Sequence, residues 1–119
     1  MRARSLATNP DLDRAAKLTA LNELYLRVMI ETAPLSMVAF GEDVERGQAL
    51  YQTSISALME ETASALYEVA IGEPLPPAAA GVAKMCMFGV HFGVAVDSMV
   101  RGEPVDVEQM AERITEIFR

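Results

Sequence analysis

Residues 78–101 read AAAGVAKMCMFGVHFGVAVDSMVR, and this stretch decides the fold class. Apolar residues occupy most positions, so the stretch predicts a long helix buried on several sides. At 100° per residue, one face collects Val82, Met85, Gly89, Phe92, Gly93, Val96 and Val100. The opposite face carries Lys84, His91 and Ser98. Because Lys84, His91 and Asp97 interrupt the apolar run, we expect no membrane span here.

Two glycines stand one helical turn apart in this stretch, at Gly89 and Gly93. Each costs about 1 kcal/mol in helix propensity, so close packing against another helix must offset that cost. The neighbouring helix could belong to the same subunit or to a second copy of the chain. We favour the second copy.

Segments on both sides of this stretch also repeat apolar residues at helical spacing. Downstream, residues 102–104 break the chain, residues 106–109 resemble a capping box, and the last helix carries a broad apolar face. Upstream, a helix is expected from about Asp43 to a stop at Gly72, followed by a stiff linker over residues 73–77. The first helix is expected to begin after Asn9 and to end at Pro34. With no alternating pattern, the sequence predicts an all-α antiparallel bundle of four to five helices.

Composition limits the function. The 119 residues suit one domain, with residues 1–9 expected to be flexible. A net charge of −7 argues against direct binding to nucleic acid, which depends on neutralising phosphates. The single cysteine, Cys86, has apolar neighbours and is expected to be a buried thiol in a cytoplasmic protein. No secretory signal is visible at the start.

No catalytic motif is present. The chain lacks a glycine-rich phosphate loop and Cys/His metal spacing, and it has one histidine. Adjacent carboxylates such as Glu60 and Glu61 point about 100° apart on a helix, so they form no acid–base pair. We therefore expect no enzyme activity, no cofactor and no metal.

His91 and the methionines allow more than one interpretation. A lone histidine on such a helix is more often a hydrogen-bonded structural residue than a ligand contact. The eight methionines could line an adaptable apolar pocket, although ordinary core filling is slightly favoured.

Two segments carry a resemblance to a known family. Residues 88–108, FGVHFGVAVDSMVRGEPVDVE, resemble the close of TetR-family transcriptional regulators, where a long apolar helix meets a turn of this type and a final helix. Residues 21–27, LNELYLR, are similar to the helix that opens the regulatory half of that family. The resemblance covers roughly residue 13 onward. The three-helix DNA-binding part that begins such regulators is absent from the sequence.

The resemblance implies a dimer formed through the last two helices and an inducer pocket among the earlier ones. Carried onto this chain, the interface consists of Gly89, Phe92, Gly93, Val96, Met110, Ile114 and Ile117. The ligand-binding residues are Tyr25, Met29, Tyr51, Ile55, Met87 and His91.

Two functions follow as expectations. The first is a TetR-like regulatory domain that forms a homodimer and senses a small, mostly apolar ligand by a population shift. The second is a helical interaction module without a small ligand, which acts by sequestering a partner protein. An enlarged internal cavity favours the first, and a solid core favours the second.

Overall fold

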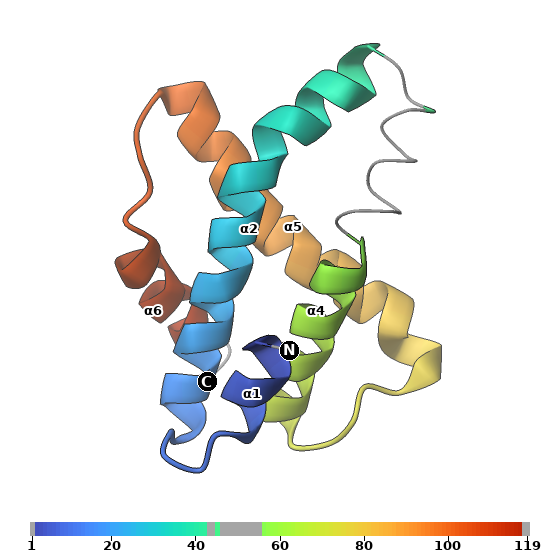
Figure 1. Ribbon diagram of the computed structural model, residues 1–119, viewed down its shortest axis with the longest axis vertical. Coiled ribbons are helices and arrows are strands. Elements are labelled where there is room, and N and C mark those ends of the chain that lie inside the picture. The colour runs from blue at the N-terminus through green and yellow to red at the C-terminus, as the bar shows by residue number, and fades with distance from the viewer. Residues whose placement is uncertain (1, 43–44, 46–55, 118–119) are drawn as a thin grey trace.

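The computed structural model of the chain describes residues 2–42, 45 and 56–117. Over these residues it contains helices and no strand, which confirms the all-α class (Figure 1). The elements are α1 (Arg2–Thr8), α2 (Arg14–Glu42), α4 (Ser56–Ile71), the short 3-10 helix η2 (Pro77–Ala79), α5 (Ala80–Arg101) and α6 (Val107–Ile117).

Helix α2 is the centre of the arrangement and contacts α1, α4, α5 and α6. Figure 1 shows α5 running diagonally behind α2 and α4, whereas α6 follows α5 and lies beside α2. The molecule measures 44 × 34 × 22 Å along its principal axes. Helix α5 therefore lies across one broad side of the molecule.

The core has two parts that meet along α2. The larger part contains Leu18, Leu21, Tyr25 and Met29 of α2, packed with residues of α1, α4 and α5. The smaller part joins Leu26 of α2 to residues of α6. Helix α2 thus buries two neighbouring faces, and this explains why its apolar stripe is wide.

The start of the chain forms a helix. Residues 2–8, expected to be flexible, make up α1, which packs against α4 and buries Ala3. The residue that caps α2 is Asp13, whose Oδ1 accepts the Ala16 amide hydrogen at 2.8 Å. The expected cap, Asn9, instead accepts from the Asp11 amide in the turn before the helix, at 2.9 Å. Both residues favour helix starts and turns, because each can accept a nearby backbone N–H.

The expectation that the first helix ends at Pro34 is wrong. Helix α2 continues through Pro34 to Glu42. Proline removes one donor, so the carbonyl one turn earlier loses its helical partner. Pro34 lies on the exposed side of α2, next to buried Ala33. On that side water can satisfy the carbonyl, and burial of the opposite face offsets the lost hydrogen bond.

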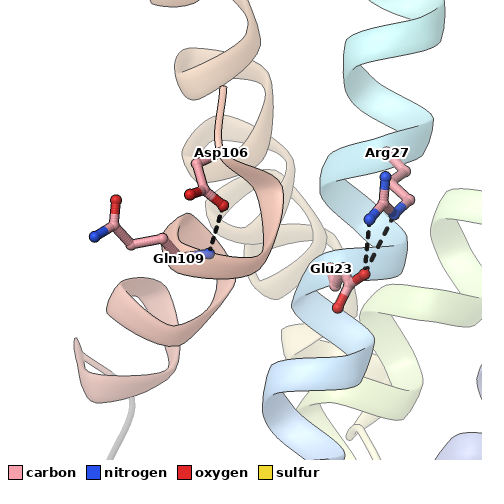
Figure 2. Close-up of polar contacts among 4 residues, drawn as sticks. All are labelled: Glu23, Arg27, Asp106 and Gln109. Carbon is pink, nitrogen blue, oxygen red and sulfur yellow. Dashed lines mark hydrogen bonds and ion pairs between the residues drawn. The ribbon is translucent and has the colours of Figure 1, made fainter. Parts of the chain in front are cut away.

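The predicted helix ends at the two glycines are confirmed. Gly72 and Gly102 both have positive φ, at 85° and 67°, a region that glycine enters without steric cost. Half of the predicted capping box of the last helix is present: Asp106 Oδ1 accepts from the Gln109 amide at 3.2 Å, whereas the Gln109 side chain points away from Asp106 (Figure 2). Figure 2 also shows the ion pair between Glu23 and Arg27, one turn apart on α2, at 2.9 Å. The predicted start near Asp43 lies outside the described residues.

The prediction that residues 78–101 are buried on several sides is wrong. In α5 only His91 and Ala95 are fully buried. The supposedly polar side that contains His91 faces the core, and much of the apolar side faces outward. Cys86 lies on the exposed side, so the expectation of a buried thiol is also wrong. Periodicity identified which residues share a face, but a helix that is apolar on two sides does not specify which side is covered.

Candidate functional site

A buried polar network joins α2, α5 and α6. His91 and Asn22 are both 0 % exposed, and Thr115 is 4 % exposed. The His91 ring donates from Nδ1 to the Met87 carbonyl at 2.7 Å, and its Nε2 lies 2.9 Å from Asn22 Oδ1. Asn22 Nδ2 donates to Thr115 Oγ1 at 3.1 Å, and that hydroxyl donates to the Ala111 carbonyl at 2.8 Å. The His91 Nδ1–H, Asn22 Nδ2 and the Thr115 hydroxyl each have an acceptor, as buried polar groups require.

Burial controls the charge of His91. Desolvation lowers the pKa of His91 from 6.5 to about 4, and the hydrogen bond to the Met87 carbonyl opposes this shift only in part. The ring is therefore neutral near pH 7. With its hydrogen on Nδ1, the neutral ring has none on Nε2, so Nε2 and Asn22 Oδ1 are two acceptors in contact. A hydrogen bond forms between them when the ring is protonated, or when the Asn22 amide turns its nitrogen toward Nε2.

The ligand-binding residues expected from the resemblance are only partly brought together. Tyr25 stacks on His91, with ring centroids 4.3 Å apart and planes inclined by 27°. Met87 is half-buried and supplies the carbonyl that His91 contacts. Met29 is 2 % exposed and belongs to the core. The other two, Tyr51 and Ile55, lie outside the described residues.

The space at this network is small. A cavity of about 10 Å³ is lined by Leu18, Asn22, Leu66, Ala70, Met87 and His91. That volume holds about one water molecule. In the described part of the chain, the core around His91 is therefore packed and leaves no room for a small organic ligand.

Sequence reasoning missed Asn22 and Thr115. Asn22 falls four residues after Leu18 and three before Tyr25, so it shares their buried helical face. A polar residue at a core position indicates a buried hydrogen-bond partner, and this signal was available. Thr115 lies between Ile114 and Glu116 near the end of α6, and nothing in the sequence pairs it with a residue 93 positions earlier.

The second candidate feature is the outer face of α5, defined here as Val82, Met85, Cys86, Gly89, Gly93 and Val100. Its large side chains are strongly exposed: Val82 at 69 %, Met85 at 76 % and Val100 at 79 %. A side chain added at Gly89 or at Gly93 would meet no atom within 4 Å. Packing among the described residues therefore does not account for either glycine.

The interface residues expected from the resemblance divide between surface and core. Gly89 and Gly93 are exposed, and Phe92 and Val96 are partly buried beside them on α5. On α6, Met110 is partly buried and packs against the smaller core, where Ile114 is 3 % exposed. Ile117 is 76 % exposed. The apolar face of α6 thus covers α2, and α5 supplies most of the exposed apolar surface.

Over the described residues, one helical stretch meets the length and composition of a membrane span. It runs over Pro77–Arg101, with a mean hydropathy of 1.5 and only 11 % of its most apolar window buried. One such helix is weak evidence for a membrane span.

Comparisons of the chain with protein-family models, with characterised proteins and with solved structures found no match. None of them identifies a TetR-type domain.

Proposed function

We propose that this chain is a helical dimerisation module and that the outer face of α5 is its contact surface with a second copy. The observation that carries the proposal is the pair Gly89 and Gly93 on an exposed apolar helix face, with open space above both. Two glycines cost about 2 kcal/mol of helix propensity in α5. A second helix that packs closely on them offsets this cost.

The charge distribution on this side of α5 suits contact between identical copies. The whole chain carries a net charge of −7, so most surfaces of two copies repel each other. The outer face itself contains no charged residue. At its edge, Asp97 and Arg101 neutralise each other at 3.0 Å. A face without unbalanced charge can meet its own copy without repulsion.

The position of the glycines supports a twofold arrangement. Gly89 and Gly93 flank the middle of α5, with Met85 and Val82 toward one end and Val100 toward the other. In a twofold contact the same patch appears on both subunits. If two copies of α5 cross at the glycines, the outer face of each helix packs against the outer face of the other.

Helix α5 supplies part of the area that a stable dimer needs. A stable interface buries about 800 Å² on each partner. Helix α5 spans roughly 33 Å and is about 10 Å wide, so its face alone offers on the order of 330 Å². The elements beside α5, on a side of the molecule whose overall extents are 44 and 34 Å, would have to supply the rest.

The resemblance to TetR-family regulators suggests a role for such a dimer. In that role the chain is a regulatory part whose dimerisation sets the spacing of two DNA-reading parts. The expected bundle would then pair through α5, with Ile117 as the exposed apolar contribution of α6.

The alternative role is sequestration of a partner protein without a small ligand. The packed core favours it, since the cavity at His91 holds about one water. The two roles share the same surface and differ in the partner that occupies it. The mass of the complex distinguishes the two roles: a homodimer has twice the subunit mass, whereas a complex with a different partner protein has another mass.

Substitution of Gly93 by leucine tests the dimer. The larger side chain blocks close approach of a second helix, and leucine has the higher helix propensity, so the subunit itself should stay folded. Sedimentation equilibrium should give twice the subunit mass for the natural chain and the subunit mass for Gly93→Leu. Circular dichroism should show unchanged helix content.

The matched control is Gly81→Leu, the same change on the same helix. Gly81 is also exposed with open space around it, but it lies about 12 Å along α5 from Gly89. This variant should remain a dimer. A natural chain that is monomeric at all concentrations, or that binds neutral lipid vesicles instead, would overturn the proposal.

A further inference from the structure

A second cleft lies where α1, the beginning of α2 and the end of α4 meet. Its volume is about 320 Å³, within the usual range of ligand pockets. It is lined by Arg4, Ala7, Thr8, Arg14, Lys17, Glu68, Val69 and Gly72. Among the described residues it offers far more space than the cavity at His91.

The cleft is positively charged, whereas the chain as a whole is negatively charged. Three of the ten lysine and arginine residues line it, against one carboxylate, in a protein whose net charge is −7. The carboxyl end of α4 adds roughly half a negative charge through the helix dipole. The three cations still outweigh the carboxylate and the helix end, so the cleft is positive.

Part of this charge already has a structural use. Arg4 pairs with Glu68 and so holds α1 against α4, with side chains 49 % and 33 % exposed. Arg14 donates from Nη2 to the Ala70 carbonyl at 2.8 Å, which satisfies one acceptor at the end of α4. A guanidinium has five donors, so most of the donors of Arg14 remain available.

Lys17 makes no structural contact of this kind. Among the described residues its ammonium group has no ion pair and no hydrogen bond, although it lines the cleft and is only partly exposed. Ala7 and Val69 also line the cleft; both are half-buried and form its apolar wall. The cleft thus combines three cations with this apolar wall.

We propose that this cleft binds a small organic acid, with its carboxylate on Arg14 and Lys17 and its apolar body on Ala7 and Val69. The volume exceeds what an inorganic anion fills, and the apolar wall has no role for such an ion. The proposal does not rest on dimerisation, because no residue of the cleft belongs to the outer face of α5.

Benzoate is a suitable probe. In ¹⁵N–¹H correlation spectra of the full chain at constant ionic strength, benzoate should shift the amide signals of Thr8, Val69 and Gly72 to saturation. The expected dissociation constant is on the order of 1 mM for a ligand of this size. Benzamide, the uncharged equivalent, should produce no saturable shift, and inorganic phosphate should bind more weakly than benzoate.

Two variants separate a site from general attraction. Lys17→Gln should weaken benzoate binding roughly three- to fivefold, as expected for one partly exposed charge. Arg113→Gln changes the net charge equally on exposed α6 and should leave binding unchanged. Absence of benzoate binding, equal weakening by both variants, equal binding of benzamide, or tighter binding of phosphate would each overturn the proposal.

Discussion

Helices α5 and α6 follow each other in the chain and expose opposite kinds of surface. Helix α6 buries Ala111 and Ile114 and turns Glu108, Glu112, Arg113 and Glu116 to solvent. Helix α5 buries His91 beside Ala95 and turns Val82, Met85 and Val100 to solvent. Helix α6 thus leaves Ile117 as its one large exposed apolar side chain among the described residues, whereas α5 carries a broad apolar surface that one subunit leaves uncovered.

The difference teaches where each helix obtains its stability. The packing energy of α6 lies in its contact with Leu26 of α2. The inner side of α5 is held in part by polar contacts, and its apolar side is the part proposed to bind a second copy. Substitutions on the two helices should therefore affect different equilibria: folding for α6 and association for the outer face of α5.

The largest expected effect comes from the buried face of α6. Ile114→Ala removes a side chain that is 3 % exposed and leaves a cavity against Leu26. It should lower the free energy of unfolding by about 3 kcal/mol, measured by urea denaturation at fixed protein concentration. Glu112→Ala is the control on the same helix, because Glu112 is exposed on the outward side of α6 and belongs to no proposed contact. It should change the unfolding free energy by less than about 0.5 kcal/mol. Equal losses from the two variants would remove the distinction between the faces of α6.

The second largest effect is expected when acid lowers the stability of the protein through His91, on the inner side of α5. The folded-state pKa of His91 is about 4, below the ordinary value of 6.5, so the unfolded chain binds a proton first as the pH falls. Stability is therefore fully present above pH 6.5 and is lost progressively between pH 6.5 and 4. From pH 7 to pH 5 the loss should be about 2 kcal/mol, because one pKa unit corresponds to about 1.4 kcal/mol.

Denaturant titrations at several pH values measure this loss. The control is His91→Gln, which keeps a hydrogen-bonding side chain and has no group that titrates in this range. Its unfolding free energy should vary much less between pH 7 and 5. If both proteins show the same pH dependence, carboxylates rather than His91 are responsible.

The smallest effect is expected on the outer face of α5. Met85→Ala removes an exposed side chain from each copy, and alanine favours the helix, so the single subunit should be as stable as before. If this face joins two copies, the dimer should weaken roughly tenfold in dissociation constant, because apolar area is lost on both sides. Arg113→Ala on the outward side of α6 should leave the dissociation constant unchanged. Sedimentation velocity over a dilution series provides the comparison, and an unaffected dimer in Met85→Ala would place the contact elsewhere.

Much of the fold was predictable from local chemistry. The helical class followed from apolar spacing, and the ends at Gly72 and Gly102 followed from the freedom of glycine at positive φ. The cap at Asp106 was also predictable, because its hydrogen bond joins residues only three positions apart. These features are decided within one turn of helix, and the sequence contains all the information they need.

Features that depend on distant contacts were not predictable in this way. Pro34 was expected to end a helix, yet tertiary packing carries α2 past it. His91 was placed on a polar face, but a residue of α2, Asn22, supplies a buried partner and draws that face inward. Of the expected ligand-binding residues, Tyr25 and Met87 do lie at His91, whereas the positive cleft at Lys17 combines three helices and has no signal in any one of them.

The hydrogen bonds around Asn22 also set an order in which the molecule can be completed. Asn22 bonds to residues 69 and 93 positions later, so both partners are synthesised long after Asn22 itself. Until α6 arrives, the Asn22 amide lacks its Thr115 partner, and the α2 surface around Leu26 stays uncovered. Contacts of such long sequence separation form slowly, because loop closure must come first. The docking of α6 should therefore be a late step in folding, and an intermediate without it should bind hydrophobic dyes.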